Sequence, residues 1–299
     1  MGVHGVGACA TFSHELRFLT TWRYVGAVCS PEAIPRALGD RATSIPLAYL
    51  SGPSFAKEMV EGHPMSVVVA AADIEVAQTV QTILSCTTFR CYVVTDVIGV
   101  EVGGALKNPL AIGAGMASGL GFGQSTIAGL VTRGCREMAM LAVALGGRAE
   151  TLAGLSGVGD LMLTCFSSLS RNNRFGAALA QGKSVEEATA EIGEVVEGYP
   201  TAGEVVRLAK LHNLSLPLFS AVASVLDGST KLDEAMGRVM DRPVGLETFP
   251  TVASGHGDAG GAAATGAAAG ANHSLAGGAG AGSRAGSGAG SGAQAGSGV

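Results

Sequence analysis

The sequence has 299 residues, enough for one large or two ordinary domains, and 47% of them are hydrophobic, which is ample for a buried core. Its formal net charge of −5 comes without a block of Lys or Arg, so it carries no electrostatic footprint for nucleic acid or for an anionic membrane. Apolar runs are interrupted well before the ~20 residues of a membrane span. We therefore expect small-molecule partners, no nucleic acid and no membrane.

The cysteines are spaced as free thiols rather than as metal ligands. There is no C-x-x-C pair, and only Cys9 has a histidine nearby, His4, so we expect no metal site. Six cysteines without a framework fit a reducing compartment. We expect a cytoplasmic protein, with the plastid stroma as the alternative, although residues 1–31 lack the Arg- and Ser-rich character of a transit peptide.

Residues 1–31 stay unassigned. They contain a formal G-x-G-x-x-A at Gly5, Gly7 and Ala10, the pattern of a dinucleotide-binding turn. A true turn of this kind follows a buried strand and opens a helix, whereas only four residues precede Gly5 and the following TFSHELRFLTTW is not clearly amphipathic. We interpret the match as chance.

Residues 32–96 alternate between helical and strand patterns. Helical patterns cover 32–38, 54–62 and 73–85, the last with Asp73 as its N-cap. Strand patterns cover 45–52, 65–71 and 89–94. We take the first of these strands to be parallel, with Gly52 at its carboxyl end. The alternation is that of an α/β sheet.

From Val97 to residue 249 the patterns are helical throughout. Ser125 is the expected cap of a long helix that runs to Leu145, and the segments S184-V-E-E and T201-A-G-E have the form of capping boxes. Further helices are expected over 216–226, with Pro217 in the first turn, and over 233–240. The predicted fold is a partial α/β domain followed by an all-α domain, with the active site where the two meet. Residues 250–299 are almost entirely Gly, Ala and Ser, and we expect a disordered low-complexity tail.

The segment 103–112, GGALKNPLAI, places Lys107 in an otherwise apolar helical stretch. A buried ammonium is costly unless it is paired, so such a lysine is a candidate acid or base. The alternative is a lysine whose stem follows the helix while its ammonium reaches water. Residues 157–176 add Asp, Thr and a Ser-Arg-Asn triplet to a glycine-bounded segment, where a core helix would need none of them.

Five motifs, ALKN, SGPSFA, GVGDLMLT, SRNNRFG and VVEGY, occur in the order in which the sequence resembles NAD(P)-dependent glycerol-3-phosphate dehydrogenases. The resemblance covers roughly residues 32–247. It implies that 32–96 is the second half of a Rossmann-like NAD(P)-binding domain and 97–249 the substrate domain. The family's first βαβ half, with its phosphate-binding loop, is then missing or replaced. The resemblance leaves room for a homodimer.

The resemblance also implies roles for individual residues. Lys107 would be the catalytic proton acceptor in alcohol oxidation. Substrate contacts would come from seven residues: Lys107, Asn108, Asp160, Thr164, Ser170, Arg171 and Asn172. The cofactor, NAD or NADP, would contact six: Gly52, Ser54, Ala56, Arg171, Val195 and Glu197. Without the resemblance, several of these have simpler interpretations as a capping turn (Asp160), a surface turn (Arg171), a turn glycine (Gly52) and a solvated helix end (Glu197).

Two functions therefore remain open. The first is an enzyme that oxidises sn-glycerol 3-phosphate reversibly to dihydroxyacetone phosphate. The second is a truncated, inactive chain that keeps the substrate domain, because no residue after Glu32 obviously replaces the phosphate-binding loop. A related hydroxyacid or phosphogluconate dehydrogenase is disfavoured, because GPSFA and SRNNRFG occur together in the named family.

Overall fold

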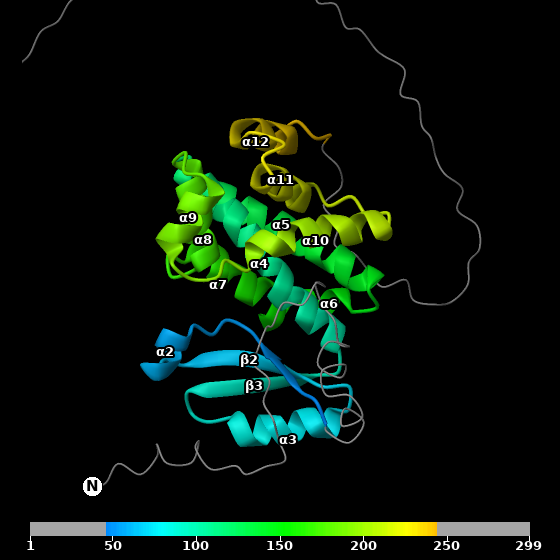
Figure 1. Ribbon diagram of the computed structural model, residues 1–299. Helices are drawn as coiled ribbons and strands as arrows, with labels where there is room; N and C mark the ends of the chain where they lie inside the picture. The colour runs from blue at the N-terminus through cyan, green and yellow to red at the C-terminus, as the bar shows by residue number, and fades with distance from the viewer. Residues whose placement is uncertain (1–45, 244–299) are drawn as a thin grey trace, which may run out of the picture. The chain divides into compact units, whose positions relative to one another are not determined.

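The computed structural model describes residues 46–243 (Figure 1). Its sheet has three strands in the order β1-β2-β3: β1 (Tyr49–Ser51), β2 (Met65–Ala70) and β3 (Phe89–Val94). β2 and β3 are parallel, with Met65 opposite Phe89, whereas β1 is antiparallel to β2, with Ser51 opposite Val68. The predicted fragment of an α/β sheet is thus confirmed, but the parallel direction expected for β1 is wrong.

The connections between the strands explain the two directions. Between β2 and β3 lies α3 (Ile74–Leu84), long enough for the crossover that parallel neighbours need. Between β1 and β2 lies only the five-residue α2 (Ala56–Val60), and Gly52, with φ of +142°, turns the chain directly after β1. Such a connection returns the chain beside β1 in the opposite direction, so Gly52 lies level with the amino end of β2.

Helices cover both faces of this sheet. On one face, α3 buries Ala77 and Val80 against Val67 and Val69 of β2. As predicted, the Asp73 carboxylate caps α3 by accepting a hydrogen bond from the Glu75 N–H at 2.9 Å. On the other face, Val68 and Ala70 of β2 pack against Val100 near the start of the next helix. Alternate residues of β2 therefore belong to two separate clusters.

The rest of the described chain is helical, as expected, and is arranged around the long α4 (Figure 1). The elements in chain order are α4 (Val97–Gly119), α5 (Gln124–Ala144), α6 (Ala149–Leu152), the π-helix η2 (Leu155–Gly159), α7 (Asp160–Phe166), α8 (Arg171–Ala180), α9 (Val185–Ile192), α10 (Gly198–Leu211), α11 (Pro217–Leu226) and α12 (Leu232–Met240). Nearly every residue of α4 from Gly99 to Ala117 is buried, because α5, α7, α8, α10 and α11 all pack against it.

Two of the predicted helix caps are wrong. α5 is capped by Gly123, so Ser125 lies inside its first turn. α10 starts at Gly198, so Thr201 is inside the helix, where its hydroxyl donates to the Glu197 carbonyl at 2.6 Å instead of capping. The capping box of Ser184 and Glu187 is confirmed, and Pro217 opens α11 as expected.

Glycines bring α8 against α4. A Cβ added to Gly115 would lie 1.9 Å from the Asn173 carbonyl oxygen, and one added to Gly176 would lie 2.0 Å from the Ile112 carbonyl oxygen. The two backbones therefore approach more closely than any side chain would allow. This contact holds the start of α8 beside the middle of α4.

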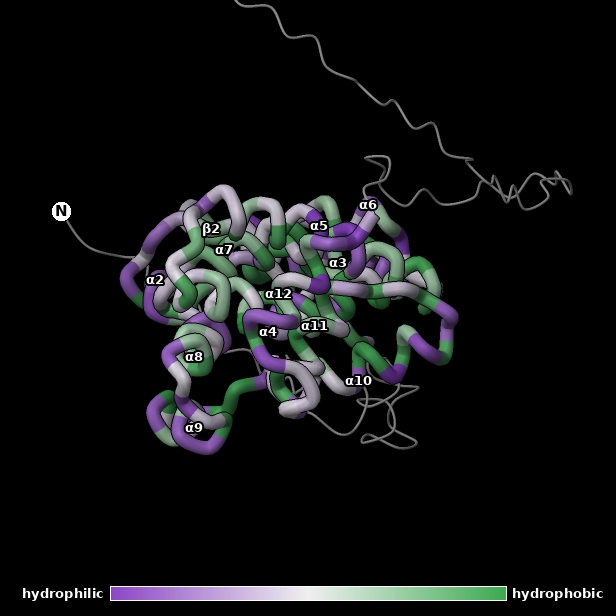
Figure 2. The backbone as a smooth tube through the Cα atoms, turned by 90° about the horizontal axis from the view of Figure 1, so that it is seen from above, coloured by the Kyte–Doolittle hydropathy of each residue, from purple (hydrophilic) through white to green (hydrophobic). Residues whose placement is uncertain are grey.

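The helical core consists of two apolar clusters. The larger includes Leu106 and Leu110 of α4 with Met138 of α5, and the smaller includes Ile112 of α4 with Phe175 of α8. Figure 2 shows hydrophobic colour along the central helices, whereas hydrophobic and hydrophilic segments alternate around α9. No single helix within 46–243 is long and apolar enough to cross a bilayer. One bent pair of segments, 149–166 with 171–180, has the length and composition of a membrane span, on those two criteria alone.

Three predictions fall outside the described residues. They are the chance G-x-G-x-x-A match at 5–10, the helix over 32–38 and the tail over 250–299.

Candidate active site

The Lys107 ammonium forms an ion pair with the Asp160 carboxylate, Nζ to Oδ2. The side chains are only 22% and 5% exposed. Lys107 therefore does not extend into solvent as a snorkelling lysine would, and its buried charge has the partner that burial requires. The structure brings together the lysine that the sequence singled out as a candidate acid or base and the aspartate that the family resemblance placed among the substrate contacts.

The chain around Asp160 is shaped to hold this carboxylate against α4. Asp160 is the first residue of α7 and directly follows the π-helix η2, a type of turn often found at functional sites. Gly103 of α4 lets η2 approach, since a Cβ there would lie 2.1 Å from the Ser156 carbonyl oxygen. The buried Thr164 hydroxyl donates to the Asp160 carbonyl at 2.6 Å, so this predicted substrate contact is engaged within α7.

Opposing effects act on the pKa of Asp160. Burial raises the pKa of the Asp160 carboxyl above its ordinary value, and the Lys107 ammonium acts in the opposite direction. Burial is the larger of the two effects, so the protonated form of Asp160 is favoured relative to the same carboxyl in water.

A second polar cluster lies next to Lys107 along α4. The Asn108 amide nitrogen donates to Glu197 Oε2 at 3.1 Å, and the Asn172 amide nitrogen donates to Asn108 Oδ1 at 3.1 Å. The Gly198 backbone N–H donates to Asn172 Oδ1 at 2.9 Å. Three predicted site residues from α4, α8 and the start of α10 therefore form one hydrogen-bonded group.

The amino ends of two well-formed helices point to this region. α8 begins at Arg171 and α10 at Gly198, and both contact α4. A helix amino end carries partial positive charge and unpaired N–H groups, so it favours an anion. At both ends an N–H group is bound within the protein, that of Asn173 by the Ser170 hydroxyl and that of Gly198 by the Asn172 amide.

Ser170 and Arg171 lie at the start of α8 but have partners of their own. The Ser170 hydroxyl caps α8 by accepting from the Asn173 N–H at 3.2 Å. The Arg171 guanidinium is partly exposed and pairs with Glu194 at 3.2 Å. Val195, the next residue after Glu194, is 71% exposed. The structure thus joins Arg171 to the segment that leads to Glu197.

The turn after β1 reaches the edge of this region. The Ser54 hydroxyl donates to the Gly52 carbonyl at 3.0 Å, and Ala56 is exposed. A Cβ added to Gly159 would lie 3.7 Å from Pro53 Cδ, so this turn lies beside the residue that precedes Asp160. Within residues 46–243, no hydrogen bond links Gly52, Ser54 or Ala56 to the Lys107–Asp160 pair.

Two partners in the site were missed in the sequence. Glu194 pairs with Arg171, and the Gly198 N–H binds Asn172. Gly198 follows Glu197 directly in the VVEGY motif, so the motif itself carried that signal. Glu194 had no local signal, because an exposed glutamate between helices is ordinary.

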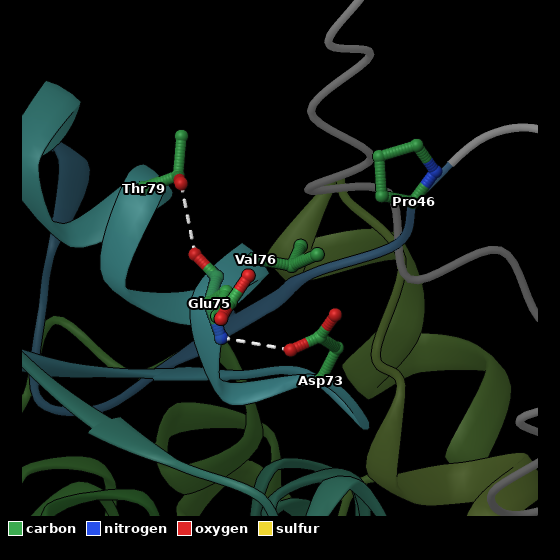
Figure 3. Close-up of a pocket in the computed structure, with 5 residues that line it drawn as sticks. All are labelled: Pro46, Asp73, Glu75, Val76 and Thr79. Carbon is green, nitrogen blue, oxygen red and sulfur yellow. Dashed lines mark hydrogen bonds between the residues drawn. The ribbon is translucent and has the colours of Figure 1, made fainter.

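A cavity of about 250 Å³ lies elsewhere, at the start of α3 (Figure 3). Five residues line it: Pro46, Asp73, Glu75, Val76 and Thr79. None is a candidate site residue, and the polar groups drawn there bond to one another within α3. Within 46–243, no group of three His, Cys, Asp or Glu side chains could hold a metal ion.

Residues 96–237 match a family described as NAD-dependent glycerol-3-phosphate dehydrogenase, C-terminus. The chain is 46% identical over 199 residues to glycerol-3-phosphate dehydrogenase (NAD(P)+) of Xanthomonas euvesicatoria pv. vesicatoria, covering 67% of this chain and 58% of the relative. It is 44% identical over 215 residues to the enzyme of the same name from Parvibaculum lavamentivorans, covering 72% and 65%. The chain belongs to the glycerol-3-phosphate dehydrogenase family.

A crystal structure from the same family has the same fold. Glycerol-3-phosphate dehydrogenase from Coxiella burnetii superposes with a TM-score of 0.64 at 39% identity, covering 66% of this chain and 61% of that one. The predicted family and fold are therefore confirmed. The chain spans 58% to 65% of the length of the curated family members compared above.

Proposed function

We propose that this chain carries the catalytic and substrate-binding part of a glycerol-3-phosphate dehydrogenase. The reaction is reversible hydride transfer between sn-glycerol 3-phosphate and NAD(P)+, giving dihydroxyacetone phosphate. The observation that carries the proposal is the ion pair of Lys107 and Asp160, held beside the amides of Asn108 and Asn172. Family membership supports the same reaction.

In this proposal Lys107 accepts the proton of the substrate hydroxyl and returns it to the carbonyl oxygen in the reverse direction. A base must be free of its proton before the step, and Asp160 is the group against Lys107 that can take the proton up. Burial of Asp160 favours its protonated form and so supports this role. Asn108 and Asn172 orient the substrate.

The substrate phosphate calls for a guanidinium and small donors, which Arg171 and its neighbours in α8 offer. The partly exposed side chain of Arg171 and the amino end of α8 support this assignment. Ser170 and Thr164 would contribute their hydroxyl groups after exchanging their present partners.

A nicotinamide cofactor, NAD or NADP, supplies the hydride acceptor when bound. Six residues would hold it: Gly52, Ser54, Ala56, Arg171, Val195 and Glu197. Val195 and Ala56 are exposed, which fits such a role, whereas Gly52 is buried against Val67 of β2. The residues that would cradle the pyrophosphate are not among those described.

The alternative is a non-catalytic chain that keeps the substrate domain. The family match covers residues 96–237, the part of the chain that this alternative keeps. Formation of NADH or NADPH from glycerol 3-phosphate by the chain distinguishes the two. Activity that appears only after a complete nucleotide-binding half is joined to the chain supports the alternative.

The role of Lys107 is tested in that joined form. Lys107→Ala should leave cofactor affinity nearly unchanged and lower turnover by ~10² to 10⁴, the usual contribution of a general acid or base. Lys183→Ala is the matched control, because Lys183 is a more exposed lysine that also pairs with one carboxylate, Glu191. Turnover within a few fold of wild type in Lys107→Ala would remove this lysine from the mechanism.

The role of Arg171 is tested by Arg171→Lys, which keeps the charge but loses the two parallel donors. If Arg171 holds the substrate phosphate, the KM for glycerol 3-phosphate should rise by an amount equivalent to roughly 1 to 3 kcal/mol. If it serves mainly the cofactor, the KM for NAD(P) should rise instead. Arg207→Lys, at an exposed arginine bonded to Glu204, is the control. No change in either constant would remove Arg171 from both binding roles.

A further inference from the structure

We propose that Glu197 is a positioning residue that, together with the Gly198 N–H, fixes the orientation of two side-chain amides, those of Asn108 and Asn172, so that both can offer a ligand only N–H donors. This inference rests on the proposed function for the identity of the ligand. The hydrogen-bonded ring itself is independent of that function.

A backbone group sets the orientation of the Asn172 amide. The Gly198 N–H can only donate, and it donates to Oδ1 of the buried Asn172 at 2.9 Å. The Asn172 amide is therefore held with its oxygen toward the start of α10. Gly198 is the residue that permits this approach, since a Cβ there would lie 2.8 Å from the same oxygen.

The orientation of the Asn108 amide follows from that of Asn172. With its oxygen used, Asn172 points its amide nitrogen at Asn108 and donates to Oδ1 at 3.1 Å. The Asn108 nitrogen must then face the other way, where it donates to Glu197 Oε2 at 3.1 Å. The two amides are therefore held from both ends, by a backbone N–H that can only donate and by a carboxylate oxygen that, when ionised, can only accept.

Because Glu197 and Gly198 are neighbours in sequence, the chain of hydrogen bonds closes into a ring. Both amide oxygens in the ring are occupied by donors. Each amide nitrogen carries two hydrogens and makes one hydrogen bond within the described part of the chain. The remaining N–H of each amide is a donor, which suits an oxygen acceptor such as a phosphoryl or alkoxide oxygen.

Glu197 is the element of the ring that a conservative change can reverse. A glutamine at 197 could donate as well as accept, so it would no longer require Asn108 to present its nitrogen. The same carboxylate is the proposed contact of the cofactor. A single side chain would then connect the cofactor side of the site with the amide next to Lys107.

The experiment follows the side-chain amide signals of the full chain by 15N–1H NMR. Asn108→Ser and Asn172→Ser identify the two NH₂ pairs by their loss. Glu197→Gln should shift both pairs and speed their hydrogen exchange by tenfold or more. Glu204→Gln, at another carboxylate of α10 that binds Arg207, should change neither. Asn172 is the decisive signal, because its side chain bonds to Asn108 and Gly198 and not to Glu197.

If Glu197→Gln leaves the Asn172 signals in place, Glu197 does not help to fix the Asn172 amide and the inference is wrong, whether or not the Asn108 signals move. Should that variant lose its dispersed backbone spectrum, Glu197→Asp takes its place, since it keeps an ionised acceptor but withdraws it by one methylene. It should shift the same two pairs, and unmoved signals would again overturn the ring.

Calorimetry with glycerol 3-phosphate separates this inference from the proposed function. Glu197→Gln should weaken binding about tenfold, whereas Glu204→Gln should leave it unchanged. Absence of binding to the wild-type chain would count against the proposed function, while the NMR result would still decide the ring. Binding that is unchanged in Glu197→Gln, with both amide pairs shifted, would show that the ring does not position groups for this ligand and would overturn its assigned role.

Discussion

Lys107 and Asp160 lie 53 residues apart in the sequence and form an ion pair between the middle of α4 and the first residue of α7. Removing the lysine alone should leave a buried carboxylate without its counter-charge. We expect Lys107→Met to lower the free energy of unfolding by about 3 to 5 kcal/mol near neutral pH. The double variant Lys107→Met/Asp160→Asn should recover most of this loss. Urea unfolding of the wild type, Lys107→Met, Asp160→Asn and the double variant measures the coupling between the two sites.

The more exposed pair of Lys183 and Glu191 is the control for this cycle. Its coupling should stay below about 1 kcal/mol, because solvent screens the two charges. Equal coupling in the two cycles would mean that burial adds nothing at Lys107.

Glu137 should make stability depend on pH. This α5 carboxylate is 4% exposed and accepts hydrogen bonds from the Leu218 and Phe219 N–H groups at 3.0 to 3.3 Å. Burial raises its pKa from 4.5 to about 7, although those N–H groups and nearby arginines act in the opposite direction. The folded state thus holds the proton more tightly than the unfolded chain does. The stability from this group is present below about pH 4.5 and is lost as pH rises through 7.

The expected loss between these two pH values is up to roughly 3 kcal/mol. Urea unfolding at pH 4.5, 6 and 7.5 should show a smaller fall in Glu137→Gln than in wild type. Glu101, whose pKa burial also raises to about 7, titrates in both proteins and cancels in the comparison. Identical pH slopes would rule out Glu137 as a source of the effect.

Gly115→Ala should disrupt the contact of α4 with α8. The new methyl group would lie 1.9 Å from the Asn173 carbonyl oxygen, which is backbone and cannot rotate away. We expect a loss of at least about 1 to 3 kcal/mol, seen as a lower urea midpoint. Gly203→Ala in α10 has nothing within 4 Å of the added Cβ and should instead stabilise by roughly 0.5 to 1 kcal/mol. If both changes stabilise the protein, the close approach at Gly115 is wrong.

Asp96 should matter more than an ordinary helix cap. Its carboxylate accepts from the Gly99 N–H at 2.9 Å, the Arg148 N–H at 2.9 Å and the Thr151 hydroxyl at 2.6 Å, so it joins α4 to α6. Asp96→Ala should cost roughly 2 to 4 kcal/mol, because buried donors lose their acceptor. Asp73→Ala, at the exposed cap of α3, should cost about 1 kcal/mol. Thermal unfolding compares the two, and equal losses would contradict the linking role of Asp96.

Lys107 and Asp160 could be singled out from the sequence because each is a charge in an apolar stretch, and burial demands a partner for it. Their direct pairing could not, because it depends on how η2 and α7 pack on α4. The amide ring was equally hidden, since its members are brought together by three helices. Apart from Lys107 as a candidate acid or base, the roles of individual residues were available only from the family resemblance.

The helix cap predicted at Thr201 and the direction predicted for β1, both made from local sequence patterns, were wrong. Thr201 and Glu204 have the spacing of a capping box, yet α10 begins three residues earlier and satisfies the Thr201 hydroxyl through the Glu197 carbonyl. The direction of β1 could not be inferred from its composition, which is the same for either direction. The short connection through α2 decides it.

Close backbone contacts flank Lys107 on both sides along α4, at Gly103 with η2 and at Gly115 with α8. Each residue of an α-helix turns the chain by about 100°, so inserting or deleting a single residue between these glycines would rotate one contact away from its partner. The segment 103–115 is therefore a fixed spacer whose length cannot change without losing a packing contact or misdirecting Lys107. Variation in length among homologous chains should consequently fall in the loops between helices and leave this stretch of α4 free of insertions and deletions.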